Sequence, residues 1–333
     1  MDIKEVKRDL GKDWSGYQEV LVSALTNRNA FVSKINKYLI DNAGKQLRPV
    51  LSLLAAKACG GINTVNHHCA AVAEMIHTAT LLHDDVADNG DLRRGVPTVK
   101  AVFGQAASVL AGDYWLAKAL EILSACNPKI LECYTTAVQE LAEGELIQME
   151  KAELLDTTIG DYYSIIAKKT ASLFIAATKS AALAIGASDE YIAAIEGYAY
   201  ELGVAFQIRD DIFDYAQNLD TGKAGGADIK ERKITLPLLC AMEIAPEDEA
   251  CNIRKQISTI GNSLARGGAA NAEEQQVIDA VNDFVHKYDG AAKSQLILEE
   301  HIRKAVKYLE ILPHSKEKEY LVQLAEFVGT REK

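Results

Sequence analysis

The same acidic pattern occurs twice in this chain, each time at the end of a strongly apolar helical segment. The first copy spans residues 84–88 (DDVAD), and the second spans residues 210–214 (DDIFD). Positions i, i+3 and i+4 share one helix face, so each copy gathers three carboxylates on a short stretch. Such carboxylates repel one another unless a cation neutralises them. Hard oxygen ligands in this arrangement suit Mg²⁺ with substrate phosphates, so two such faces meeting across a cavity predict several Mg²⁺ ions around one diphosphate.

An acidic triplet on a helix is more often only a solvated face. Here the preceding residues argue against that interpretation. Residues 77–82 lead into the first copy and residues 202–208 into the second, and both stretches are mostly apolar. We therefore expect both copies at the rim of a hydrophobic core.

Composition narrows the class of protein. The chain has 333 residues with a net charge of −11 and no strongly basic stretch, which argues against a nucleic-acid partner. Its 6 cysteines lack metal-binding spacing and are typical of reduced thiols. The N-terminus has no apolar signal segment, and no apolar run approaches the roughly 20 residues of a membrane span. We expect a cytoplasmic protein without stable membrane insertion.

Helical periodicity dominates the chain, and no convincing strand alternation is found. The pattern predicts an all-α fold, a single large helical bundle around a central cavity, with one domain over residues 1–333. We expect three or four helices after residue 247. Before them, the expected helices cover residues 15–42, 47–59, 64–89, 106–126, 129–154, 159–186, 188–217 and a segment from about Leu236.

Several cations accompany the acidic copies. Arginine clamps phosphate oxygens with a planar fork, and lysine acts as a point charge. In an acidic protein these cations match a site for two diphosphates, although each one alone is as well explained as a surface salt-bridge partner. The candidates are Lys45, Arg48, Arg93, Arg94, Lys168, Lys169, Lys223 and Lys233.

Together these motifs resemble the trans-prenyltransferase family, the head-to-tail isoprenyl diphosphate synthases, over nearly the whole chain. The resemblance rests on residues 83–95 (HDDVADNGDLRRG), residues 206–214 (FQIRDDIFD) and residues 233–237 (KITLP). It implies the isoprenoid synthase fold and is strongest to long-chain, octaprenyl-type synthases. Three positions depart from the family pattern. Ala43 and Arg232 stand where glycine is common, and Arg209 places a charge next to the second acidic pair.

The resemblance implies a role for each matching residue. Two to three Mg²⁺ ions would bind the allylic diphosphate through Asp84, Asp85, Asp88, Asp210, Asp211 and Asp214. Arg93, Lys169 and Lys223 would stabilise the leaving diphosphate, with Lys233 at the mouth. Isopentenyl diphosphate would bind Lys45, Arg48, His77 and Arg94, although a lone histidine on an apolar helix is more often a core residue. Thr170 and Gln207 would direct oxygens at the transient carbocation.

Product length depends, in this interpretation, on the residues that precede the first motif. Ala79 lies five residues before Asp84, with Thr80 beside it. Short-chain members of the family tend to carry a large aromatic residue there, so the small Ala79 predicts an open tunnel and a long all-trans product. Ile76 is the alternative floor. The resemblance also implies a homodimer.

Alternative functions remain at this point. One is a short-chain farnesyl or geranylgeranyl diphosphate synthase. Another is a non-catalytic subunit of a heteromeric synthase, although such subunits typically lose the acidic motifs that this chain keeps. A class I terpene cyclase normally replaces the second motif and needs no cation pocket for isopentenyl diphosphate. A metal phosphohydrolase would need a His/Asp set beyond His83 and Asp84.

Overall fold

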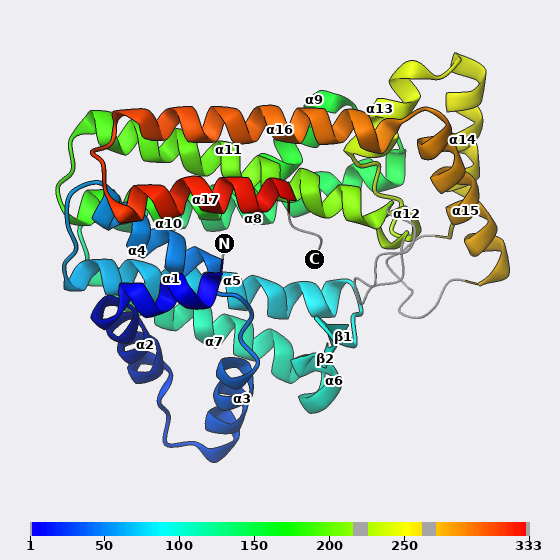
Figure 1. The fold of residues 1–333 in the computed structure, drawn as a ribbon. Helices are drawn as coiled ribbons and strands as arrows, with labels where there is room; N and C mark the ends of the chain where they lie inside the picture. The colour runs from blue at the N-terminus through cyan, green and yellow to red at the C-terminus, as the bar shows by residue number, and fades with distance from the viewer. Residues whose placement is uncertain (1, 216–225, 262–270, 331–333) are drawn as a thin grey trace. The chain divides into compact units, whose positions relative to one another are not determined.

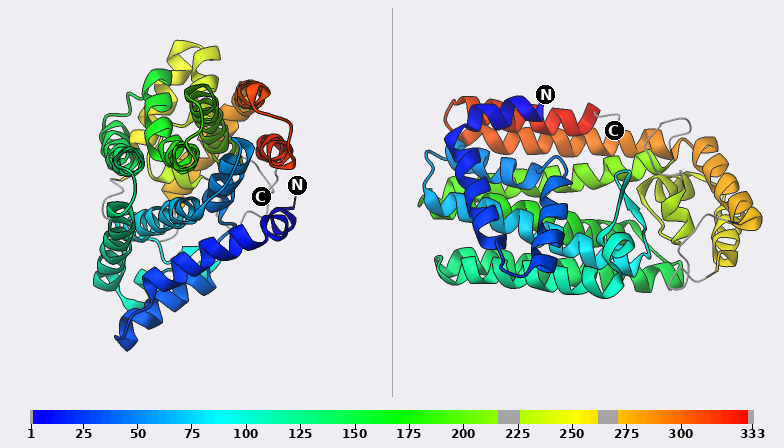
Figure 2. Two further views of the ribbon diagram at one scale, coloured as in Figure 1. Left: turned by 90° about the vertical axis from the view of Figure 1, so that its left-hand side faces the viewer. Right: turned by 90° about the horizontal axis from the view of Figure 1, so that it is seen from below.

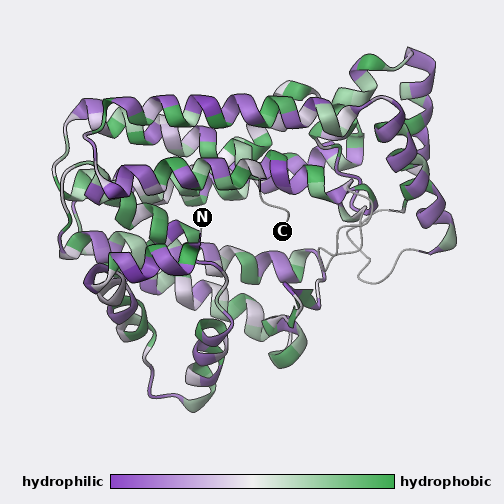
Figure 3. Cartoon of the chain, viewed as in Figure 1, coloured by the Kyte–Doolittle hydropathy of each residue, from purple (hydrophilic) through white to green (hydrophobic). Residues whose placement is uncertain are grey.

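The fold is described from a computed structural model that covers residues 2–215, 226–261 and 271–330. These residues form helices almost throughout, with one two-stranded hairpin, so the predicted all-α class is confirmed (Figure 1). Purple and green alternate along most helices in Figure 3, as expected for helices with one core-facing and one solvated face. Every helix within the described ranges is too short or too polar to cross a lipid bilayer.

The chain groups into two compact units, which are described separately. Unit 1 comprises Met1–Gln139, Ser172–Tyr200 and Ala305–Ala325, and unit 2 comprises Glu140–Ala171, Glu201–Lys304 and Glu326–Lys333. Four helices run from one unit into the other along the chain. They are α8 (Pro128–Leu154), α11 (Asp189–Asp214), α16 (Gly290–Tyr308) and α17 (Lys316–Thr330). The single domain and its central cavity stay predictions.

Unit 1 is built around α5. Residues 69–76 of this helix are all buried, which is typical of a helix surrounded by others. It packs against α2, α4, α7 and α10, and Figure 2 shows α5 and α7 side by side. The helices of this unit are α1 (Ile3–Leu10), α2 (Lys12–Leu25), α3 (Ala30–Asp41), α4 (Leu47–Ala58), α5 (Thr64–Ala87), α6 (Val99–Phe103), α7 (Gln105–Ser124) and α10 (Ser172–Ala184).

Unit 2 contains shorter helices around the end of α11. The helices α13, α14 and α12 each pack against α15. A π-helical segment, Ala167–Ala171, follows α9 directly. The remaining elements are α9 (Ile159–Ile166), α12 (Ala227–Lys230), α13 (Leu236–Ile244), α14 (Glu247–Thr259) and α15 (Ala272–Lys287).

Most predicted helices match the structure, and three expectations were wrong in detail. The helix expected over 15–42 is two helices, because Thr26 is extended and the Asn29 side chain caps α3 by accepting from the backbone N–H groups of Phe31 and Val32. The helix expected over 159–186 is interrupted by the π-helical segment. Helix α1 was not expected at all.

A fourth difference is a short hairpin where no strand was expected. β1 (Leu92–Arg93) pairs with β2 (Val96–Pro97) in antiparallel register. The two residues between them have φ values of 55° and 77°. Positive φ at both positions is typical of a tight two-residue hairpin turn, and glycine in the second position suits it. The turn places Arg93 and Arg94 directly after the first acidic motif.

Candidate active site

The first acidic motif occupies the C-terminal end of α5 in unit 1. Asp84 and Asp85 lie in the last turn, and Asp88 is the C-cap residue. Asp85 is only 6% exposed, whereas Asp88 is exposed. The motif thus begins in the core and ends at the surface, as the sequence predicted for a helix end at a core rim.

The hairpin supplies a cation to this motif. The Arg93 Nε donates to the Asp85 Oδ1 at 2.7 Å. A charge-assisted bond of this length is among the stronger ones in proteins. The bond holds the hairpin against the end of α5 and brings Arg93 to the carboxylates, as the proposed contact with a leaving diphosphate would require.

A second set of cationic side chains, around His77, lies in the same unit. The His77 pKa is held well below its ordinary value by burial, and the positive charges of Arg48, Arg94 and Arg93 lower it further. The imidazole is therefore neutral near pH 7, and these arginines come from α4 and the hairpin. A Cβ added to Gly44 would come within 1.6 Å of the Arg94 Nη1. Only glycine there allows this arginine to lie against the backbone.

The other residues expected near isopentenyl diphosphate and the tunnel also lie in unit 1. Lys45 is exposed, immediately before α4. Ala79 is 1% exposed inside the core, and the Thr80 hydroxyl donates to the His77 backbone carbonyl at 3.0 Å. Because Ala79 is buried, a growing prenyl tail would pass it only after the neighbouring side chains move apart. The chain-length role of both residues stays a prediction.

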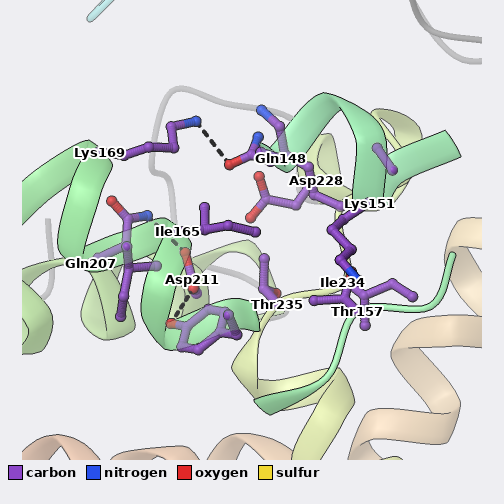
Figure 4. Close-up of a pocket in the computed structure, with 14 residues that line it drawn as sticks. Gln148, Lys151, Thr157, Ile165, Lys169, Gln207, Asp211, Asp228, Ile234 and Thr235 are labelled. Carbon is purple, nitrogen blue, oxygen red and sulfur yellow. Dashed lines mark hydrogen bonds between the residues drawn. The ribbon is translucent and has the colours of Figure 1, made fainter. Parts of the chain in front are cut away.

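The second acidic motif lies in unit 2, where a pocket forms beside it (Figure 4). Side chains from α8, α9, α11, α12 and the π-helical segment line this pocket. Four of its lining residues were predicted from sequence: Lys169, Gln207, Asp211 and Lys233. Others were missed, among them Gln148, Lys151, Tyr162 and Asp228.

A chain of hydrogen bonds fixes the carboxylate of Asp211. The Thr170 hydroxyl donates to the Gln207 Oε1 at 2.8 Å, and the Gln207 Nε2 donates to the Asp211 Oδ1 at 2.8 Å. The other oxygen of Asp211 accepts the Tyr162 hydroxyl at 2.6 Å. Figure 4 shows Gln207 and Asp211 close together beside the pocket. In this structure Thr170 and Gln207 therefore orient a carboxylate, and their predicted role at the carbocation stays a prediction.

The electrostatics of this pocket fit a bound cation. Burial raises the Asp211 pKa to about 8, the negative charges of Asp228 and Asp210 raise it further, and the donors Tyr162 and Gln207 oppose the rise. A carboxyl with such a pKa is mostly protonated near pH 7. Its unshared oxygen lone pairs, beside further carboxylates, are the donor set that a hard divalent cation prefers. Within the described residues no group of three His, Cys, Asp or Glu side chains is gathered so that it could hold a metal ion, so the predicted metal stays a prediction.

The π-helical segment is approached closely by two other helices, at Gly144 and at Gly203. A Cβ on Gly144 would come within 2.8 Å of the Lys169 Cγ, and a Cβ on Gly203 within 2.6 Å of the Ala171 Cα. Lys169 reaches Gln148 at 2.8 Å and Glu145 at 2.6 Å. π-Helical turns are frequent at functional sites, and here one interrupts a helix at the predicted phosphate-binding lysine.

Asp214 has a structural partner of its own. Its two carboxylate oxygens accept the backbone N–H groups of Ala227 at 3.1 Å and Asp228 at 3.0 Å, at the start of α12. This contact places Asp228 beside Asp211. Lys233 follows, bonded through its backbone N–H to the Asp228 carbonyl at 2.8 Å and through its side chain to Glu231. Metal binding by Asp214 stays a prediction.

Two of the three departures from the family pattern can be described from the structure. Arg209 donates to Gln295 at 2.8 Å and stacks over Phe213, and it does not line the pocket. Arg232 has a φ of 59°, a left-handed conformation that favours the glycine usual at this position. Its guanidinium donates to the Glu153 carbonyl at 3.2 Å, which offsets part of the strain.

The structure thus brings the predicted residues together in two sets. Unit 1 holds the first motif with Lys45, Arg48, His77, Arg93 and Arg94, and unit 2 holds the second motif with Lys169, Thr170, Gln207 and Lys233. Lys223 lies outside the described residues. A sequence signal existed for Asp228, which follows a glycine-rich stretch close to Lys233. Tyr162 has no such signal, because only the fold brings α9 to α11.

An all-α fold with two acidic helix ends and adjacent cations is typical of isoprenoid-diphosphate enzymes. Comparison with known proteins agrees. The family model described as polyprenyl synthetase matches residues 29–266, and the chain belongs to this family. The predicted family and the predicted prenyltransferase class are confirmed.

Individual relatives cover almost the whole chain. It is 36% identical to the all-trans-nonaprenyl-diphosphate synthase (geranyl-diphosphate specific) of Rhodobacter capsulatus, over 96% of this chain and 95% of that protein. It is 35% identical to the short chain isoprenyl diphosphate synthase of Methanothermobacter thermautotrophicus, over 90% of each. The crystal structure of polyprenyl synthase from Caulobacter crescentus, complexed with calcium and isoprenyl diphosphate, superposes with a TM-score of 0.88 at 31% identity, covering 100% of this chain and 98% of that one.

Proposed function

We propose that this protein condenses isopentenyl diphosphate head-to-tail onto an allylic diphosphate and makes a long-chain all-trans polyprenyl diphosphate. The observation that carries the proposal is the complete second motif in unit 2. Its buried Asp211 lies among further carboxylates, and Lys169 lines the same pocket. A non-catalytic subunit has no need for such a set. Charges of this kind are costly to bury unless a cation or substrate uses them.

Each residue has a role in this proposal. Asp84, Asp85, Asp88, Asp210, Asp211 and Asp214 hold two to three Mg²⁺ ions, which when bound neutralise charge on the allylic diphosphate. Arg93, Lys169, Lys223 and Lys233 stabilise the negative charge that develops as the allylic C–O bond breaks. Thr170 and Gln207 keep Asp211 oriented and direct oxygens toward the cation.

The second substrate binds in unit 1. Lys45, Arg48 and Arg94 hold the diphosphate of isopentenyl diphosphate, and the neutral His77 donates a hydrogen bond to it. The double bond of this substrate then forms the new C–C bond to the allylic carbon. The departing diphosphate removes the resulting proton, so no side-chain base is required.

Product length separates the two main alternatives. The nonaprenyl synthase and the short-chain synthase are similarly related to this chain. Sequence identity to these relatives therefore does not decide the chain length of the product. The proposal of a long product rests on the small Ala79. A short-chain synthase that makes farnesyl or geranylgeranyl diphosphate would instead have its floor at Ile76.

The test is a product profile. Wild-type protein with Mg²⁺, labelled isopentenyl diphosphate and an allylic primer should give products well beyond geranylgeranyl diphosphate. Ala79→Tyr should shorten them to about three or four isoprene units, because a packed interior has little slack for a tail beside a ring. Ala292→Tyr is the matched control, since Ala292 is exposed on α16. A wild type that stops at a short product, or an unchanged profile in Ala79→Tyr, refutes the open-tunnel interpretation.

The proposal includes a homodimer in the cytoplasm. Exposed apolar side chains on α7 support the dimer: Leu110 is 67% exposed and Leu120 is 45% exposed. Sedimentation equilibrium would show a mass near twice that of the chain, and Leu110→Lys should shift it toward the monomer. A monomeric wild type refutes this part.

A further inference from the structure

A glutamine in the pocket of unit 2 has no role in the mechanism above. Gln148 lies on α8, is half-buried, and lines the pocket together with Asp211 and Asp228. Its Oε1 accepts a hydrogen bond from the Lys169 Nζ at 2.8 Å, which Figure 4 shows as a dashed line beside the pocket. Gln148 therefore contacts the lysine to which the proposed function assigns the leaving diphosphate.

This hydrogen bond fixes which end of the Gln148 amide faces the lysine. An ammonium group has three donors and no acceptor, so only the amide oxygen can bond to it. The amide nitrogen is the other branch of the same planar group. Within the described residues the Gln148 Nε2 has no hydrogen-bond partner. Its two N–H donors can therefore bond to a ligand in the pocket.

The other glutamine of this pocket shows the contrast. The Gln207 Oε1 accepts from the Thr170 hydroxyl, and its Nε2 donates to the Asp211 Oδ1, each at 2.8 Å. Both ends of that amide are thus engaged in holding a carboxylate. Gln148 uses only its oxygen. Of the two amides, Gln148 is the one that can donate to an anion without giving up a bond to the protein.

Lys169 has a second partner, which lies outside the pocket. The Glu145 Oε1 is 2.6 Å from the Lys169 Nζ, and the Glu145 side chain is 40% exposed and does not line the pocket. Glu145 lies three residues before Gln148 on α8, on the same helix face. An exposed ion pair is screened by water and contributes little to stability. A diphosphate can therefore replace Glu145 at the ammonium, whereas the neutral Gln148 can keep its bond.

We propose that Gln148 binds the allylic diphosphate through its amide N–H groups while its carbonyl oxygen orients Lys169 toward the same diphosphate, an inference that rests on the proposed function. Phosphate oxygens only accept hydrogen bonds, and the carboxylates of Asp211 and Asp228 in this pocket repel them. Lysine acts as a point charge without a fixed direction. An amide donor bonded to that lysine adds a second, directed contact, and its neutral oxygen leaves the lysine charge intact.

The test variant is Gln148→Glu, which keeps the size and an acceptor for Lys169 but replaces the N–H donors with a negative charge. The KM for the allylic primer should rise at least ten-fold. The Kd for farnesyl thiodiphosphate, an allylic analogue whose C–S bond resists ionisation, should rise equally in calorimetry with Mg²⁺. The KM for isopentenyl diphosphate should stay within about two-fold, because its proposed cations belong to unit 1.

A second variant separates the lost donors from the added charge. Gln148→Met removes both polar ends of the side chain without adding a charge. It should raise the same KM and Kd by a smaller factor, about three- to ten-fold. It also serves as the readout if Gln148→Glu does not fold.

Two controls come from the same helix. Gln139 is exposed on α8, so Gln139→Glu makes the identical substitution away from the pocket and should leave all three constants unchanged. Glu145→Gln removes the competing carboxylate and should leave the Kd for the analogue unchanged or lower it. A rise in that Kd would show that Glu145, rather than Gln148, holds the lysine in its working position.

The outcomes separate the inference from the proposed function. A rise confined to the allylic KM and the analogue Kd in both Gln148 variants supports the role of Gln148. Unchanged values, equal rises in both KM values, or the same selective rise in Gln139→Glu or Glu145→Gln overturn it while wild-type condensation continues. A wild type that does not condense isopentenyl diphosphate at all refutes the proposed function instead.

Discussion

Replacing Asp211 by asparagine should change how the stability of the metal-free protein depends on pH. The folded-state pKa of Asp211 is about 8, because of burial first and of Asp228 next. The pKa of an aspartate in the unfolded chain is about 3.9. Between these values the folded protein holds a proton that the unfolded chain has released. Stability from this group is therefore fully present at low pH and is lost as pH rises through the folded pKa.

The expected magnitude follows from one proton. Each pH unit inside this window changes the free energy of unfolding by about 1.4 kcal/mol. From pH 5 to pH 7 the wild type should lose on the order of 3 kcal/mol from this group, or roughly 5 °C in melting temperature for a chain of this size. The Asp211→Asn variant has no titrating group at this position, so it should not lose this part of the free energy of unfolding between pH 5 and pH 7. Groups that do not interact with Asp211 titrate alike in both proteins and cancel in the difference.

The assay is thermal unfolding by circular dichroism at pH 5, 6, 7 and 8 with a chelator present. Asp161→Asn is the control, because backbone and hydroxyl donors of Thr158 lower the pKa of that capping carboxylate. The stability it contributes is lost only as pH falls toward its folded pKa, so the control should shift the melting temperature equally at every pH tested. Parallel curves for wild type and Asp211→Asn from pH 5 to pH 8 would refute the reasoning.

Three further predictions concern turnover, substrate binding and packing. Asp84→Ala or Asp210→Ala should reduce turnover by several orders of magnitude with helicity retained, and near wild-type rates at saturating Mg²⁺ would contradict the metal role. Lys45→Ala should raise the KM for isopentenyl diphosphate more than that for the primer, by the equivalent of about 1.5–3 kcal/mol, and equal effects on both would show wrongly assigned pockets. Gly203→Ala should destabilise the protein by about 1–3 kcal/mol in a chemical denaturation series, because the added Cβ would lie 2.6 Å from the backbone of the π-helical segment. Gly160→Ala is the control and should be nearly neutral, because its added Cβ meets no atom closer than 3.7 Å.

The sequence predicted those parts of the site that depend on local pattern. Both acidic motifs lie at helix ends because a 3.6-residue period and apolar flanks are visible in a single segment. Arg93 and Arg94 were found for the same reason, through their closeness to the first motif. The hairpin that holds them was not predicted, although its Arg-Gly turn carries a positive-φ signal.

Features that depend on packing between distant segments were missed. The π-helical segment exists where Gly144 and Gly203 let two other helices approach it, and neither glycine is near it in sequence. Gln148 is one polar residue among many on its helix, and only the fold shows that it bonds to Lys169. Tyr162 reaches Asp211 across 49 residues of chain. Such contacts carry no periodic signal within a window of the sequence.

The two acidic motifs are nearly identical in sequence but differ in how their buried carboxylates are compensated. Asp85 in unit 1 pairs with the guanidinium of Arg93, so its charge is balanced by a residue of the same unit. Asp211 in unit 2 accepts from the neutral groups of Tyr162 and Gln207 and lies near other carboxylates, so its pKa rises. Because an arginine stays charged under all these conditions, the first motif needs an added cation less than the second. We therefore predict that the second motif depends more strongly on bound metal than the first, a difference that no comparison of the two five-residue patterns reveals.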